Sequence, residues 1–187
     1  MNLKQLSISF FLVLSLFIFS GCEEDTTPDP EALDQDSTYV EDYIDYVVDG
    51  DTIEFYDTGR VRLYGVDTPE TYQSSRLDAQ ADACAAGDKN IIQLMGGEST
   101  NYVRSAMSQY SYYDLKILGL DTYDRTIAVV IIPIDGPLNK LLVRDGFAVP
   151  FMDSYNLYEE DLIFAKNNNR GLWKHYHSEM DCLSKLK

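Results

Sequence analysis

The sequence has 187 residues, of which 45% are hydrophobic, and a formal net charge of −16 at pH 7. This hydrophobic content suffices for the core of one domain of ordinary size, and the charge excludes a protein that holds nucleic acid through a generally basic surface. Ten acids and no Lys or Arg lie at residues 23–45, so much of the excess charge belongs to one segment and any phosphate site must be local.

The first 21 residues have the pattern of a signal peptide. Lys4 precedes an apolar run at residues 8–19, which is short for a membrane span but has the length of a signal-peptide core. A short transmembrane anchor is the alternative. The run ends in FSGC at residues 19–22, which resembles the lipobox of bacterial lipoproteins and implies lipid attachment at Cys22. We therefore expect an exported protein that acyl chains hold on a bacterial membrane, in the periplasm or at the cell surface.

The chain after the leader divides into three parts. Residues 22–39 are rich in acids, Pro and Thr, which predicts a disordered, self-repelling tether. One domain is expected at residues 40–177, followed by a C-terminal tail at 178–187. If Cys22 carries lipid, Cys84 and Cys182 remain, and we expect them to pair in an oxidising compartment. Two free thiols are the alternative.

The first half of the domain predicts strands followed by an irregular segment. Residues 43–56 predict a strand pair or one long bent strand, residues 57–59 a turn, and residues 60–66 the next strand. Thr68, Pro69 and Glu70 have the composition of a helix or turn start. Residues 72–95 show no clear periodicity and are expected to form an irregular loop with some helix.

The second half alternates helices and strands. Helices are expected from Gly97 to about residue 109, at 137–146 and at 157–169, and strands at 115–120, 126–132 and 147–151. Short strands with helices between them predict an α+β protein dominated by a small β-barrel. We expect a five-stranded OB-fold with about three helices.

Several acids near the first strands have the chemistry of a cation site. Asp51, Asp67 and the Thr68 carbonyl would supply hard oxygen ligands, which suit calcium or magnesium. The chain offers no Cys/His cluster for zinc, because His175 and His177 lie near its end. Each acid taken alone is explained equally well as a turn residue.

Two arginines have the chemistry of a phosphate clamp. A planar guanidinium makes paired hydrogen bonds to phosphate oxygens. Arg62 lies between the apolar residues Val61 and Leu63, and Arg125 lies between Asp124 and Thr126, just before Ile127. The simpler explanations are a salt bridge for Arg62 and a solvated loop charge for Arg125. Arg62 and Asp67 are five residues apart, on opposite faces of an ideal strand, so one site requires a bulge or strand end, for which Gly65 is suitably placed.

Taken together, these segments resemble the thermonuclease family, the staphylococcal-nuclease-like proteins. The resemblance rests on DGDT at 49–52, RLYGVDTPET at 62–71 and YDR at 123–125, in this order. NKLLVRDGFA at 139–148 and AKNNNRGLW at 165–173 are also similar to that family, so the likeness covers roughly residues 43–176. Thr122 departs from the family, which often has Lys before the pocket Tyr.

This resemblance implies a calcium-dependent phosphodiesterase on an OB-fold that binds one Ca²⁺ and cuts DNA and RNA with little sequence preference. The implied metal ligands are Asp51, Asp67 and Thr68. The implied catalytic residues are Glu70, which activates or orients water, and Arg62 and Arg125, which contact the phosphate. The implied nucleotide-binding residue is Tyr123. No protein partner is implied, and a monomer is expected.

Two other functions fit parts of the sequence. A binding module with the same fold but without catalysis predicts the loss of at least one of these acids or arginines, and all are present. An oligosaccharide-binding OB-fold lipoprotein would use some of the fourteen Tyr residues for stacking. That alternative leaves the ordered acids and arginines unexplained.

Overall fold

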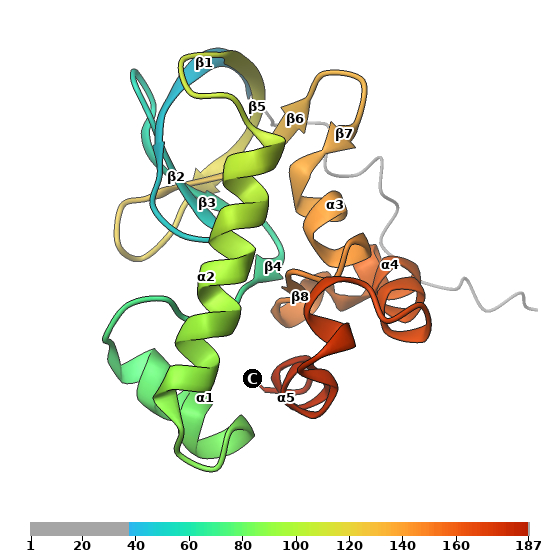
Figure 1. The fold of residues 1–187 in the computed structure, drawn as a ribbon. Helices are drawn as coiled ribbons and strands as arrows, with labels where there is room; N and C mark the ends of the chain where they lie inside the picture. The colour runs from blue at the N-terminus through green and yellow to red at the C-terminus, as the bar shows by residue number, and fades with distance from the viewer. Residues whose placement is uncertain (1–37, 187) are drawn as a thin grey trace, which may run out of the picture.

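The computed structural model describes residues 38–186, and Figure 1 shows its ribbon. The predicted leader, the predicted lipid site at Cys22 and most of the predicted tether lie outside this range. The elements are β1 (Thr38–Val47), β2 (Thr52–Phe55), β3 (Gly59–Leu63), β4 (Val66–Asp67), α1 (Ser75–Cys84), α2 (Lys89–Ala106), β5 (Tyr112–Leu120), β6 (Thr126–Ile132), β7 (Gly136–Pro137), α3 (Leu138–Arg144), β8 (Val149–Pro150), η2 (Met152–Ser154), α4 (Tyr155–Asn167), η3 (Gly171–Lys174) and α5 (His177–Leu183). None of the helices among these residues combines the length and apolar character needed to cross a bilayer.

Five strands close into a small barrel. β1 pairs antiparallel with β2 and β5, β2 with β3, and β5 with β6, and a parallel pairing of β3 with β6 closes the circle. In β6, Ala128, Val130 and Ile132 are buried at alternate positions, as expected for a strand with one face in the core. The prediction of an α+β protein built on a five-stranded OB-type barrel is confirmed.

The strand expected at residues 147–151 is not part of this barrel. It is reduced to β8, which pairs with β4 in a separate two-stranded sheet between the barrel and α4. Pro150 has no N–H group to donate, which suits a short edge pairing rather than a central strand. Residues 43–56, predicted as a strand pair or one long bent strand, form the end of β1 and all of β2. Because these are two strands, the barrel has five strands without residues 147–151.

Residues 72–95 were expected to form an irregular loop with some helix, and they are mostly helical, because they form α1 and the first part of α2. Ser74 caps α1, and its Oγ accepts a hydrogen bond from the Leu77 N–H at 3.0 Å. The helix expected to start at Gly97 begins earlier, at Lys89. Gly96 lies inside α2, where a Cβ would meet the Pro69 carbonyl oxygen at 2.5 Å. Glycine therefore lets α2 pass directly against the segment that follows β4.

Residues 38–186 contain five α-helices, where about three were expected, and the two additional ones are α1 and α5. α5 occupies the segment described from the sequence as a tail, and its Met180 and Leu183 are buried in the core. Figure 1 shows α2 running from the barrel down to α1, with α5 beside α1 at the same end of the molecule. Thr68, Pro69 and Glu70 form no helix start and lie in the connection between β4 and α1.

Candidate active site

The register of β2 and β3 places Asp51 beside Arg62. Thr52 lies opposite Arg62 in the antiparallel pair, and the Leu63 N–H donates to the Asp51 carbonyl at 2.8 Å. Asp51 directly precedes β2 and is only 6% exposed. The turn before it is fixed by Asp49, whose Oδ1 accepts a hydrogen bond from the Asp51 N–H at 3.1 Å.

A chain reversal at Gly65 brings Asp67 back to Arg62. β3 ends at Leu63, and Gly65 has a φ of +71°, a conformation that favours glycine. A Cβ at this position would also meet the Ser154 side chain at 2.7 Å. The reversal lets Arg62 Nη2 lie 2.9 Å from Asp67 Oδ1, although the two residues are five positions apart.

Arg62 lies between two nearly buried carboxylates. Its Nη1 forms an ion pair with Asp51 and its Nη2 pairs with Asp67. The second oxygen of Asp51 accepts hydrogen bonds from the Thr68 N–H at 3.0 Å and the Thr68 hydroxyl at 3.1 Å. Burial lowers the pKa of Arg62, and the charge of Asp67 opposes this effect. The predicted metal ligands and one predicted phosphate contact therefore form one hydrogen-bonded cluster.

Glu70 is held beside this cluster by α1 and its N-cap residue. Gln80 Oε1 accepts a hydrogen bond from the Glu70 N–H at 2.9 Å, and the Ser74 hydroxyl donates to Glu70 Oε2 at 3.4 Å. Arg76 Nε lies 3.2 Å from Glu70 Oε1. Burial raises the pKa of the Glu70 carboxyl, and the charge of Arg76 opposes this effect. The backbone and the side chain of Glu70 are thus positioned by the same helix.

Arg76 is a residue of the candidate site that sequence reasoning missed. Its Nη2 lies 2.6 Å from Asp67 Oδ2, and its guanidinium lies 5.5 Å from the centre of the Phe151 ring, which Arg62 also approaches at 5.9 Å. The signal that predicts it is local: Ser74 is a good N-cap residue, and Asp78 follows in the first turn of the helix. These two features predict a helix start, even though the segment shows no helical periodicity.

Arg125 and Tyr123 lie next to the cluster without joining it. β6 runs parallel to β3 with Thr126 opposite Val61, so Arg125, which directly precedes β6, lies at the start of the strand next to the one that carries Arg62. Burial and, to a lesser degree, the positive charge of Arg125 lower the pKa of Arg62. Arg125 Nε pairs with Asp121 Oδ2 at 2.6 Å, and its guanidinium lies 5.6 Å from the ring centre of Tyr123, which is 79% exposed.

The cluster offers oxygen donors of the kind that hard cations prefer. Among residues 38–186, no group of three or more His, Cys, Asp or Glu is arranged to hold a metal ion, and the predicted set has only two carboxylates. Those two belong to Asp51 and Asp67, which are at most 8% exposed. Counting Asp49 and Glu70, the carboxylates here outnumber the guanidinium groups of Arg62 and Arg76. A bound cation would offset the excess negative charge.

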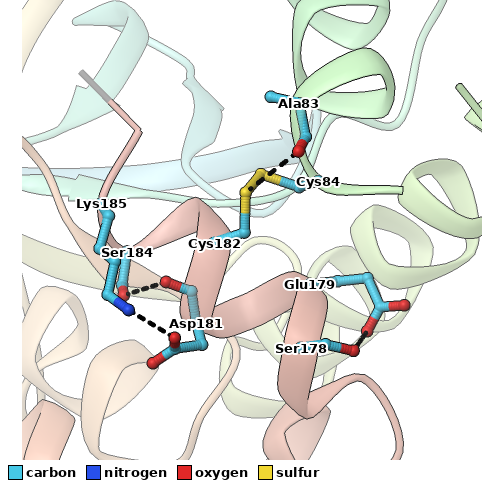
Figure 2. The surroundings of a disulfide bond; sticks show 8 residues. All are labelled: Ala83, Cys84, Ser178, Glu179, Asp181, Cys182, Ser184 and Lys185. Atoms are coloured by element: carbon cyan, nitrogen blue, oxygen red, sulfur yellow. Dashed lines mark hydrogen bonds and ion pairs between the residues drawn. A yellow bond between two sulfur atoms is a disulfide. The ribbon is translucent and has the colours of Figure 1, made fainter. Parts of the chain in front are cut away.

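A disulfide ties α1 to the end of the chain. Cys84, the last residue of α1, is bonded to Cys182 in α5 with a Cα–Cα distance of 5.5 Å, as Figure 2 shows. Lys185, two residues after α5, pairs through its Nζ with Asp181 of that helix at 2.6 Å. Figure 2 draws this pair beside the disulfide. Because α1 positions Glu70 at its other end, the disulfide anchors the helix that supports the cluster.

Two comparisons with known proteins show which family the chain belongs to. A family model described as staphylococcal nuclease homologue matches residues 60–175, more than half of the chain, and this range includes every predicted catalytic residue and excludes Asp51. Endonuclease YhcR of Bacillus subtilis (strain 168) is 27% identical over 146 residues, which cover 71% of this chain and 11% of that protein. The chain thus spans only about a tenth of the length of this relative. It belongs to the staphylococcal nuclease homologue family.

Proposed function

We propose that this protein is a calcium-dependent phosphodiesterase, an endonuclease that hydrolyses DNA and RNA with little sequence preference. The observation that carries the proposal is the placement of Arg62 between Asp51 and Asp67, with Glu70 fixed beside them by α1. Membership of the family and the likeness to an endonuclease support nuclease-type hydrolysis.

The guanidinium groups would act on the phosphate. Arg62 comes from β3, and Arg125 directly precedes β6, the strand that pairs with β3, so in this proposal both side chains turn toward one diester. A diester gains negative charge as water attacks it, and fixed positive groups stabilise that charge more than the ground state. When the diester binds, the Arg125 guanidinium would leave Asp121 and pair with the phosphate instead.

Glu70 would accept a proton from the attacking water or orient that water. Such a role requires a carboxylate held within hydrogen-bond reach of the water. The contacts from Ser74, Arg76 and Gln80 restrict Glu70 in this way before substrate arrives.

Asp51, Asp67 and Thr68 are the residues that would hold the calcium ion. When bound, the ion would supply positive charge that polarises the phosphoryl oxygen. The protein contributes two nearly buried carboxylates whose orientation Thr68 and Arg62 already fix through hydrogen bonds and ion pairs. Weak general affinity for nucleic acid is expected, because the chain is strongly acidic.

The experiment is a cleavage assay with the purified full-length chain. Labelled single-stranded DNA and RNA are incubated with calcium or with excess chelator, and the products are separated on a denaturing gel. Cleavage of both polymers with calcium, and of neither with chelator, is expected. Undiminished cleavage in chelator would contradict the calcium requirement, and binding without cleavage would favour the non-catalytic alternative.

We also propose that the enzyme is exported and held on a membrane by lipid at Cys22, as a monomer. The support for the anchor is the sequence of the first 22 residues. Cys22→Ser should release the protein from the membrane fraction of cells that export it. Unchanged partition into membranes would instead favour a leader that is retained as a transmembrane anchor.

A further inference from the structure

A hollow of about 500 Å³ lies between the end of β1 and the end of α2. Its apolar floor includes Ile44, Val47 and Met107, which are at most 8% exposed. Its walls include two tyrosines, Tyr46 and Tyr72, which are 46% and 55% exposed. An apolar floor with exposed aromatic walls is typical of a site for a flat, ring-containing ligand.

The hollow shares two chain segments with the candidate active site. Val48, which also lines it, directly precedes the turn that carries Asp51, and Tyr72 follows Glu70 by two residues. The two segments are joined, because the Tyr72 hydroxyl donates to the Val48 carbonyl at 3.0 Å. Tyr72 therefore forms a wall between the hollow and the cluster around Arg62.

The strand register places the hollow on one side of Arg62 and Tyr123 on the other. Val47 of β1 lies opposite Ile53 of β2. Thr52, next to Ile53, lies opposite Arg62 of β3. β6, which Tyr123 and Arg125 precede, is the next strand beyond β3. Neighbouring strands are about 4.8 Å apart, so a diester at Arg62 would have Tyr123 on its β6 side and the hollow on its β1 side.

We propose that this hollow binds the nucleoside on the side of the scissile phosphate opposite Tyr123. The proposal rests on the proposed nuclease function. Tyrosine rings stack on any base, which suits a polymer of variable sequence. Arg104 lies in the wall, where its Nη2 donates to the Val47 carbonyl at 3.4 Å, and it supplies positive charge for the neighbouring phosphate.

A second hollow, of about 730 Å³, lacks these features. It is lined by residues that include Asp145, Arg170 and Lys174, and it contains none of the segments that form the candidate active site. Arg170 is paired there with Asp145 at 2.7 Å. This hollow supplies a control position for removing a positive charge.

The test compares substrates that have a nucleoside on one side or on both sides of the diester. The full-length chain is assayed on a thymidine dinucleoside phosphodiester and on the 3′- and 5′-methyl phosphate esters of thymidine, whose methyl group has no ring to stack. Tyr46→Ala and Arg104→Gln should each lower kcat/KM roughly tenfold for the dinucleoside and for one of the two esters. The other ester should be unaffected, because it places no nucleoside in the hollow. Tyr39→Ala, at a 60% exposed tyrosine of the same strand, and Lys174→Gln are the matched controls.

The outcomes separate the subsite from the proposed function. Equal losses on all three substrates, or no loss on any, would overturn the subsite while leaving nuclease activity established by the wild-type rates. Wild-type protein that cleaves none of the three substrates, and no polymer in the gel assay, would overturn both. Selective loss on the dinucleoside and one ester, with unchanged controls, would support the assignment.

Discussion

Arg76 joins Asp67 to Glu70: its Nη2 lies 2.6 Å from Asp67 Oδ2 and its Nε lies 3.2 Å from Glu70 Oε1. One side chain from the first turn of α1 thus contacts the predicted metal ligand Asp67 and the predicted catalytic carboxylate of Glu70. Such contacts orient the groups that react, and losing them commonly costs ten- to a hundredfold in activity or metal affinity. We therefore treat Arg76 as a positioning residue.

Arg76→Ala should lower kcat by about ten- to a hundredfold, because Glu70 loses its paired cation and its fixed orientation. Stability should change little, since 44% of the Arg76 side chain is exposed and exposed ion pairs contribute little. Single-turnover cleavage of single-stranded DNA, with thermal unfolding as a companion measurement, checks both points. Arg76→Lys should recover part of the loss.

Lys89→Ala is the matched control for this variant. Lys89 also pairs with a carboxylate of α1, that of Asp78 at 2.6 Å, and is similarly exposed, but it does not contact the cluster. Wild-type turnover is expected. An equal loss of turnover in both variants would show that any lost ion pair of α1 disturbs the site, and it would contradict a specific role for Arg76.

The disulfide should contribute strongly to stability. Cys84 and Cys182 are 98 residues apart, so their bond removes much of the freedom of the unfolded chain. Replacing both by Ser should lower the free energy of unfolding by about 2–5 kcal/mol in urea. α1 keeps its buried contacts through Leu77 and Ala81, so the folded variant should retain activity within about twofold. A large loss of turnover without loss of stability would contradict this prediction.

Asp42 should stabilise the barrel through the turn after β2. Its carboxylate accepts hydrogen bonds from the backbone N–H groups of Tyr43, Asp57 and Thr58, at 2.7 to 3.1 Å. Asp42→Ala leaves those donors without their acceptor and should cost about 1–3 kcal/mol at pH 7. Urea unfolding of both proteins measures the difference.

The stabilisation by Asp42 should also depend on pH. Burial raises the pKa of Asp42, but the backbone donors of Thr58, Asp57 and Tyr43 together outweigh burial and hold it below its ordinary value of 3.8. A carboxyl with a lowered folded-state pKa stabilises the fold above its unfolded-state pKa and loses that effect as the pH falls through the folded-state pKa. The difference between wild type and Asp42→Ala should therefore shrink below about pH 4. A difference that grows on acidification would show that the carboxylate is not the stabilising form.

The barrel was predictable from sequence because its strands carry their own patterns. In β6 the β-branched residues alternate between core and surface, and the turn before β3 has a hairpin composition. Asp51, Asp67 and Arg62 were also identified from sequence, since they lie in short segments of distinctive composition. The break at Gly65 that brings Asp67 to Arg62 is visible in the sequence as a glycine inside a strand pattern.

α1 and α2 were less predictable, because contacts with other parts of the fold decide which residues they bury. α2 continues through two glycines, which local propensity disfavours, because Gly96 must pass against the Pro69 backbone. α1 is polar and rich in alanine, and its buried face includes Gln80, which bonds to the Glu70 backbone rather than packing as an apolar residue. Arg76 was missed for this reason, since its function depends on a helix that the periodicity does not reveal.

The central claim is that Arg62 and Arg125 act on one phosphodiester beside Glu70, and Arg125→Ala tests it most directly. Arg125 pairs with Asp121, four residues earlier in the same connection, so its removal should leave thermal unfolding nearly unchanged. Arg170→Ala, which also removes one member of an exposed Arg–Asp pair, is the control and should keep wild-type turnover. The measurement is kcat on single-stranded DNA with calcium, and the account predicts a loss of about a hundred- to thousandfold in Arg125→Ala. Wild-type turnover in this variant would contradict it.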